Sequence, residues 1–212
     1  DIGKTAVSTS IWAKEGDLTP EEFERVQAHP EAGFEILRST GMGLLPAHVA
    51  YQHHERWDGS GYPRGLKERD ILKYARICAV CDVFDAMTSD RPYKKAIHPS
   101  IGLAFILENS GILFDPEVTE AFSRVTAPFP LATGVKLSTG ETAIVKKLNP
   151  RALDRPIVVA VRSPGGEFYS TPRQMDLQNQ IDITIVSYVD WYTAPADTGI
   201  KMVSRLAADT IQ

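Results

Sequence analysis

The 212-residue sequence carries no excess of positive charge, and this limits what it can bind. Lysine and arginine number 23 against 27 aspartate and glutamate residues, so the formal net charge is −4 with histidine neutral. General nucleic-acid binding depends on a basic surface that attracts phosphates, and we expect none here. A nucleotide ligand would have to be held locally by a few cations.

Long apolar runs are absent as well. A membrane-spanning helix needs about 20 consecutive apolar residues, and no stretch of the sequence approaches that length. The first residues also lack the charged and then apolar pattern of a secretory signal. We therefore expect a cytoplasmic protein with no membrane contact in this segment. Its 43% apolar and 24% charged residues are typical of a domain with a packed core.

Cysteine is scarce, since the chain contains only Cys78 and Cys81. Two cysteines at this spacing can form a redox or zinc pair, but no second pair is present to complete a zinc site. Both lie within the helical pattern "ARICAVCDVFDAM". We predict that both are buried, reduced core thiols, as is usual in a cytosolic protein.

The spacing of apolar residues predicts helices from Thr19 to about Arg124. The run "LTPEEFERV" contains a helix start signal, in which Thr19 caps the first turn, Pro20 suits its first position and Glu22 completes a capping box. Apolar positions then recur at helical intervals, with glycine and proline clusters between the segments. We predict an all-α helix bundle over residues 1–126.

The second part of the sequence has the pattern of β-structure. The runs "VKLSTGETAIVKKLN", "RPIVVAVRSPGGEFYS" and "IDITIVSYVD" are rich in β-branched residues and contain turn pairs such as Thr139-Gly140. They predict a small antiparallel β module over residues 127–212, so the fold class is α+β. This part has no histidine, and we expect an accessory module that covers the bundle or forms a homodimer contact. Residues 196–212 are predicted to form a short amphipathic helix or a partly ordered tail.

Histidines gather in the helical part of the chain. Four of the five lie close together in the sequence, namely His29, His48, His53 and His54. Imidazole and carboxylate groups together suit Mn, Fe, Zn or Ni and indicate a hydrolytic or oxygen-handling metal centre. A single histidine is more often a hydrogen-bonded residue at a helix end. Adjacent helical side chains diverge by about 100°, so His53 and His54 cannot both be core filler, and the pair favours a metal site.

Four motifs in a fixed order carry a resemblance to a known family. They are "DIGK" at the start, "HPEAGFEIL" from His29, "HHERWDGSGYPRGL" from His53 and "ARICAVCDVFDAMTSDRPYKKA" from Ala75. Together they resemble HD-GYP domains, the bacterial branch of the HD superfamily of metal phosphohydrolases that degrades cyclic di-GMP. The resemblance covers about residues 1–125. It implies an HD-type helix bundle that holds two or three divalent metals, commonly iron or manganese, with nickel or zinc as alternatives.

The resemblance also implies roles for individual residues. The implied metal ligands are Asp1, His29, His53, His54 and Asp82, with Asp1 bridging two metals. Lys4 matches a lysine that contacts the substrate phosphate beside the metals. It is therefore implied both in catalysis, together with Asp1, and in substrate binding.

Other matching positions concern the dinucleotide and a protein partner. Arg91 and Lys94 in "SDRPYKK" match cations that hold the dinucleotide backbone, although such a charge run is more often a solvated helix start. Gly61, Tyr62 and Pro63 form a loop beside the site that is implicated in binding diguanylate cyclase (GGDEF) partners. Tyr62 is also assigned to substrate binding.

Several polar residues near the motifs have simpler interpretations. Asp58 precedes a glycine and fits a turn in which its carboxylate caps local amides. Asp85 lies nearly on the helix face of the last implied ligand and could support a ligand histidine. Glu55 is expected to pair with a neighbouring cation. His48 and His98 match no ligand position and are interpreted as structural.

The sequence departs from the family pattern at its start. In the family a histidine precedes the aspartate of the first motif, and an upstream helix supplies another. This sequence begins at the aspartate. We therefore expect a partial domain without these upstream helices, with an incomplete ligand set, weak metal binding and low activity.

The resemblance favours a phosphodiesterase in bacterial second-messenger signalling. A metal-activated bridging hydroxide would attack phosphorus while Lys4 stabilises the phosphoryl charge, giving pGpG or GMP. An alternative is a catalytically weak regulatory module that binds cyclic di-GMP or a GGDEF partner through the GYP loop. A third hypothesis, another HD-type phosphohydrolase or a diiron oxygenase, needs the same ligands but neither "GYP" nor "RPYKK".

Overall fold

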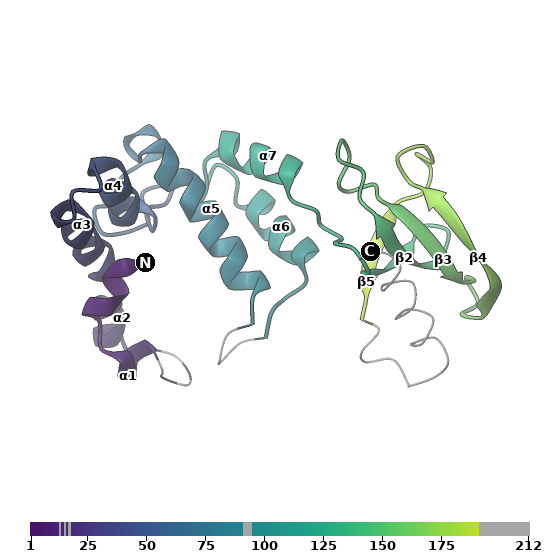
Figure 1. Ribbon diagram of the computed structural model, residues 1–212, viewed down its shortest axis with the longest axis horizontal. Helices are drawn as coiled ribbons and strands as arrows, with labels where there is room; N and C mark the ends of the chain where they lie inside the picture. Colours follow the sequence, from purple (N-terminus) through teal and green to yellow (C-terminus); the bar gives the residue numbers. More distant parts are fainter. Residues whose placement is uncertain (13, 15, 17, 91–94, 191–212) are drawn as a thin grey trace. The chain divides into compact units, whose positions relative to one another are not determined.

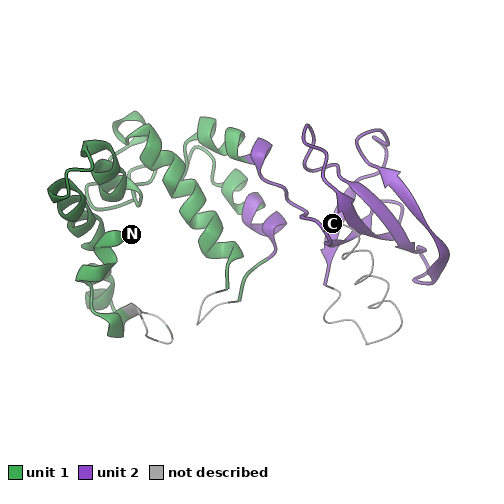
Figure 2. Cartoon of the chain, viewed as in Figure 1, with its two compact units in different colours: residues 1–97, 104–122 green, residues 98–103, 123–212 purple. Residues whose placement is uncertain are grey.

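The protein is described by a computed structural model that covers residues 1–12, 14, 16, 18–90 and 95–190 (Figure 1). The chain separates into two compact units, shown in different colours in Figure 2. The first consists of residues 1–97 and 104–122, and the second of residues 98–103 and 123–212. Residues 196–212, for which a short helix or a partly ordered tail is predicted, lie outside the described part.

Helices make up the first part of the chain, as predicted. The described helices are η1 (Ile2–Ala6), α1 (Thr9–Trp12), α2 (Pro20–Gln27), α3 (His29–Ser39), α4 (Leu44–Gln52), η2 (Glu68–Asp70), α5 (Lys73–Thr88), α6 (Pro99–Glu108) and α7 (Pro116–Val125), where η marks a 3-10 turn. None of the described helices has both the length and the apolar character that a bilayer span requires. A core of Val80, Ile106, Phe114 and Val118 packs α5, α6 and α7 together in the first unit.

The start of α2 confirms the predicted capping box. The Thr19 hydroxyl accepts a hydrogen bond from the Glu22 amide at 3.2 Å, and the Glu22 carboxylate accepts one from the Thr19 amide at 2.7 Å. Pro20 occupies the first turn, where its missing N–H costs nothing. These local bonds satisfy two backbone donors that a helix start leaves unpaired.

The two cysteines differ in exposure, which corrects part of the prediction. Both are free, but Cys78 is only half-buried and Cys81 is exposed. Helix α5 buries Ala75, Ala79 and Val80. Cys81 follows Val80 and therefore points about 100° away from it around the helix. The apolar sequence around Cys81 could not reveal which face of α5 is covered.

The predicted antiparallel β module is present in the second unit. Its strands are β1 (Gly134–Leu137), β2 (Thr142–Lys147), β3 (Ile157–Arg162), β4 (Phe168–Asp176) and β5 (Ile185–Val189). They form one sheet in the order β4-β3-β2-β1-β5, with antiparallel neighbours throughout. The α+β fold class is therefore confirmed. Strand β4 contains Pro172, which is tolerated there because β4 is an edge strand.

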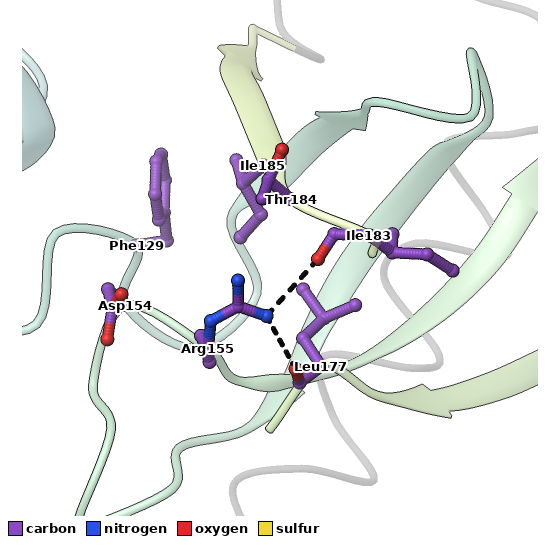
Figure 3. Close-up of a pocket in the computed structure, with 7 residues that line it drawn as sticks. All are labelled: Phe129, Asp154, Arg155, Leu177, Ile183, Thr184 and Ile185. Atoms are coloured by element: carbon purple, nitrogen blue, oxygen red, sulfur yellow. Dashed lines mark hydrogen bonds between the residues drawn. The ribbon is translucent and has the colours of Figure 1, made fainter. Parts of the chain in front are cut away.

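Alternating side chains of these strands build the core of the β module. Val135, Val145, Val158 and Met175 are almost completely buried in it. A cavity of about 150 Å³ lies in this unit and is lined by residues that include Phe129, Asp154 and Arg155 (Figure 3). The Arg155 guanidinium donates hydrogen bonds to the carbonyl oxygens of Leu177 and Ile183 at 2.9 and 3.4 Å (Figure 3). Its charge therefore ties the segment between β4 and β5 to the sheet.

A buried carboxylate stabilises the turn between β1 and β2. The Glu141 side chain is 6% exposed and accepts hydrogen bonds from the hydroxyls of Tyr169 and Thr139, both at 2.8 Å. Arg173 contacts the same carboxylate at 3.0 Å. Burial by itself raises the pKa of Glu141, but these hydrogen bonds and the Arg173 charge outweigh it and hold the pKa below its usual value.

We expect Glu141→Gln to lower the free energy of unfolding of the β module by about 1 to 3 kcal/mol, because a charged acceptor is lost from a buried network. Thermal unfolding at pH 7 measures this loss. The folded pKa of Glu141 lies below the unfolded one, so its contribution is present above pH 4.5 and is lost as the pH falls through the folded value. The difference between the two proteins should therefore shrink in acid. The exposed Glu167→Gln is the control, and an equal loss there would contradict the prediction.

Candidate metal centre

Four of the five predicted ligands lie together in the first unit. Asp1 precedes η1, His29 begins α3, and His53 and His54 follow the end of α4. One ligand atom from each of these four residues lies within 4.8 Å of the others. Segments far apart in the sequence therefore present three imidazoles and one carboxylate to the same point.

The approach of η1 to α3 depends on two glycines. A Cβ atom on Gly3 would lie 1.9 Å from the His29 carbonyl oxygen and 2.5 Å from the Gly33 nitrogen, distances that no side chain can occupy. Only glycine therefore lets η1 lie directly on the first turns of α3. This contact brings Asp1 next to His29, and the sequence analysis gave Gly3 no role.

The ligand histidines are oriented by backbone hydrogen bonds. The Nδ1 atom of His29 lies 2.7 Å from the Val26 carbonyl oxygen, and that of His53 lies 2.8 Å from the Ala50 carbonyl oxygen. A carbonyl accepts only, so each Nδ1 carries the proton and each Nε2 keeps a lone pair. These two Nε2 atoms lie 3.4 Å apart. Two lone pairs facing each other at this distance favour a cation between them.

The carboxylate of Asp1 completes this arrangement. Its Oδ1 atom lies 3.5 Å from the Nε2 atom of His29 and 3.6 Å from that of His53. Its other oxygen, Oδ2, accepts a hydrogen bond from the Lys4 ammonium at 2.7 Å. Lys4 thus holds the carboxylate with one oxygen turned to the histidines.

Burial keeps the imidazoles neutral. It lowers the pKa of His29 to about 4 and that of His54 to about 2, and it also lowers the pKa of His53. Positive charge on the neighbouring rings lowers the pKa of His29 and that of His54 further. At neutral pH all three rings are therefore in the form that binds a metal.

The residues fit a divalent transition metal. Metal–nitrogen and metal–oxygen bonds of about 2.1 Å separate neighbouring ligand atoms by roughly 3 to 3.4 Å. The three separations among Asp1, His29 and His53 are close to this range. Neutral imidazoles and a carboxylate suit Fe, Mn, Zn or Ni better than Ca or Mg.

A pocket of about 500 Å³ adjoins the ligand cluster. Its lining consists of Asp1, Leu37, Leu45, Pro46, Val49, Ala50, His53, Tyr74, Cys78 and Asp82. Asp82, the fifth predicted ligand, thus lies on the pocket wall but outside the group of four. Its charge acts on His53 by raising the pKa of that ring against the effect of burial. The pocket can therefore hold a molecule whose reacting atoms lie at the histidines.

The GYP loop packs directly on the ligand pair. The ring of Tyr62 stacks on His54 with the centroids 4.8 Å apart, and burial raises the pKa of Tyr62 to about 12. The Tyr62 amide donates to the His54 carbonyl oxygen at 3.2 Å. Gly61 is required here, because a Cβ atom would lie 2.4 Å from that oxygen and from the Arg56 nitrogen.

Glu55 holds this loop, which corrects the prediction that it pairs with a cation. The side chain is buried, and its two carboxylate oxygens accept hydrogen bonds from the amides of Arg64 at 2.9 Å and Leu66 at 3.0 Å. Backbone donors replace the expected cation because the loop folds back over the helix end. In the sequence, only the position of Glu55 directly after the histidine pair indicated that it has a role near the site.

Other predicted residues lie as follows. Asp58 accepts a hydrogen bond from the Ser60 amide at 2.9 Å, which confirms the turn. Asp85 is exposed and accepts from the Ser89 hydroxyl at 2.9 Å, so the prediction that it supports a ligand histidine is wrong. Although it lies nearly on the helix face of Asp82, its position near the end of α5 leaves it exposed to solvent. Arg91 and Lys94 lie outside the described residues.

Two further histidines pack against aromatic rings. His48 on α4 lies with its ring centroid 5.1 Å from that of Phe34. In the second unit, His98 stacks on Tyr188 at 4.2 Å with the rings nearly parallel. Its Nδ1 atom also accepts a hydrogen bond from the Ser100 amide at 3.2 Å in the first turn of α6. Both positions have structural contacts that account for the residue.

Comparison with known proteins concerns the same part of the chain. A family profile described as HD domain matches residues 1–118. A cyclic di-GMP phosphodiesterase of Thermotoga maritima is 50% identical over 127 residues, which are 59% of this chain and 34% of that protein. A cyclic di-GMP phosphodiesterase of Pseudomonas aeruginosa is 42% identical over 159 residues, or 74% of this chain and 38% of that protein.

A third relative differs in the substrate that its name specifies. The 3'3'-cGAMP-specific phosphodiesterase 3 of Vibrio cholerae is 38% identical over 130 residues, which are 61% of this chain and 28% of that protein. The chain spans about a third of the length of the curated relatives it matches. The three relatives are thus all named as phosphodiesterases of cyclic dinucleotides.

Proposed function

The chain belongs to the HD domain family, in its HD-GYP branch, and we propose that the protein hydrolyses cyclic di-GMP to pGpG or GMP as a metal-dependent phosphodiesterase. The observation that carries this proposal is the cluster of three neutral imidazoles and one carboxylate at the edge of a 500 Å³ pocket. Relatives at 50% and 42% identity carry the name of this activity.

Asp1, His29, His53 and His54 would hold the metal in this proposal, with Asp82 as a further ligand from the pocket wall. A bound divalent metal, for which we propose iron or manganese, supplies Lewis acidity that activates water and balances phosphoryl charge. The backbone bonds of His29 and His53 keep their Nε2 lone pairs turned inward, so no rearrangement is needed for binding.

Lys4 and the GYP loop have separate roles in this proposal. The Lys4 ammonium, beside Asp1, would stabilise the negative charge that develops on the phosphoryl oxygens. Tyr62 would bind substrate at the edge of the site and keep His54 in place by stacking on it. We propose Arg91 and Lys94 as further cations for the dinucleotide backbone.

A second function is favoured by the position of the GYP loop, which lies beside the site and is only partly buried. In this alternative the protein binds cyclic di-GMP or a GGDEF partner without efficient turnover. The β module would then provide a homodimer contact. The alternative uses the same ligand cluster and differs in the rate of hydrolysis.

The decisive experiment measures pGpG released from cyclic di-GMP by the metal-free protein after anaerobic addition of Mn²⁺ or Fe²⁺. The proposal expects release that depends on the added metal and stops with a chelator. Binding of cyclic di-GMP without release would favour the regulatory alternative. Neither binding nor release by the metal-loaded protein would contradict both.

A further inference from the structure

Tyr74 on α5 presents an aromatic ring to the pocket that adjoins the metal centre. The residue is 58% exposed and lines the same 500 Å³ pocket as Asp1, His53 and Asp82. Within the described part of the chain, no ring stacks on Tyr74 and no residue bonds its hydroxyl group. A large aromatic side chain is usually buried or partnered, so the free ring face is available to a ligand in the pocket.

Tyr74 lies on the same face of α5 as Asp82, the predicted metal ligand on this helix. Tyr74, Cys78 and Asp82 follow one another at intervals of four residues and therefore share one face of the helix. At 1.5 Å rise per residue, the Cα atoms of Tyr74 and Asp82 are about 12 Å apart. A nucleotide can bridge such a separation, with its phosphate at the ligand end and its base at the aromatic end.

The remaining wall of the pocket suits a flat, largely apolar group. Helix α4 contributes Leu45 and Val49, which lie eight and four residues before His53 and on the same face. Apolar walls with one exposed aromatic ring favour stacking of a base over recognition by hydrogen bonds. The end of the pocket at the metal ligands thus suits a phosphate group, and the end at Tyr74 suits a nucleobase.

We propose that the ring of Tyr74 stacks on a purine base of the cyclic dinucleotide whose phosphodiester lies at the metal centre. This inference rests on the function proposed above and names a residue that binds the base. Stacking does not distinguish guanine from adenine, because every base offers a flat π face. Tyr74 therefore contributes affinity for cyclic di-GMP and for 3'3'-cGAMP alike, and selection between them lies elsewhere.

The test compares Tyr74→Ala and Tyr74→Phe with the unchanged 212-residue protein, all loaded with Mn²⁺. Three quantities are measured: bound metal per chain, the Kd for a fluorescent cyclic di-GMP, and KM and kcat for cyclic di-GMP. Tyr74→Ala should raise Kd and KM by about tenfold to a hundredfold, the effect of losing one stacked base. Bound metal should be unchanged, and kcat should stay within about threefold. Tyr74→Phe should keep the original values, because it retains the ring.

The matched control is Ile77→Ala, since Ile77 is also exposed on α5 but is not part of the pocket lining. Unchanged Kd in Tyr74→Ala would overturn the inference and leave the proposed hydrolysis intact. Loss of bound metal in Tyr74→Ala would also overturn it, because the residue would then act through the metal centre. Binding that depends on Tyr74 without any hydrolysis would support the inference and contradict the phosphodiesterase. Absence of both binding and hydrolysis in the unchanged protein would overturn the two together.

Discussion

Replacing His53 by alanine is expected to remove bound metal and phosphodiester hydrolysis together. The Nε2 atom of His53 faces both His29 and Asp1 at 3.4 and 3.6 Å, so its loss opens the centre of the ligand cluster. Loss of a residue that only supports a ligand typically costs tenfold to about a hundredfold in metal affinity or activity. Loss of the ligand itself should cost at least about a hundredfold in both. Metal analysis of the purified variant and release of pGpG measure the two effects.

His48→Ala is the control for this experiment. His48 lies on the same helix, but it packs against the ring of Phe34 and not against the ligand cluster. The His48→Ala protein should therefore keep its metal and most of its activity while losing some thermal stability. If His53→Ala retained full metal content and lost only activity, the assignment of His53 as a ligand would be wrong.

Gly3→Ala is expected to lower metal affinity and the rate of hydrolysis about as much as His53→Ala does, although it removes no ligand. The new Cβ atom would have to lie 1.9 Å from the His29 carbonyl oxygen, so η1 must move away from α3. Asp1 and Lys4 move with η1 and lose their positions beside the histidines. Displacement of a reacting group by about 1 Å can lower turnover about a hundredfold, and Mn²⁺ affinity should fall with it. Metal titration and initial rates measure both effects.

The control for this substitution is Gly165→Ala in the β module. Gly165 has only the Ser163 hydroxyl oxygen near the position of its Cβ atom, at the ordinary distance of 3.7 Å. It should leave metal affinity and rates unchanged. Circular dichroism of both variants separates a local shift of η1 from unfolding of the helical unit. Normal metal affinity in a folded Gly3→Ala protein would show that the contact with α3 does not position Asp1.

Predictions that depend on neighbours in the sequence were confirmed. The start of α2 follows from Thr19, Pro20 and Glu22, because the capping bonds join residues three positions apart. The turn at Asp58 follows in the same way from its own side chain and the Ser60 amide. Antiparallel strands in the second part were predictable because alternation and turn pairs are also local patterns.

Predictions that depend on distant partners were less successful. Cys81 was expected in the core, but its burial depends on which face of α5 is covered by other helices. Glu55 was expected beside a cation, but it accepts two amide hydrogen bonds from a loop that begins several residues later. Neither partner can be identified from spacing alone, since tertiary packing chooses them.

The sequence by itself determined the α+β class, the helix and turn signals, and the set of histidines and aspartates that could hold a metal. These features depend on residue type and on short-range order along the chain. Only the tertiary structure decided which oxygen of Asp1 faces His29, that Asp82 lies on the wall of the pocket, and that Tyr74 lines the same pocket. The physical reason is that such contacts depend on how closely backbones approach, as Gly3 and Gly33 do, and close approach is a property of packed elements.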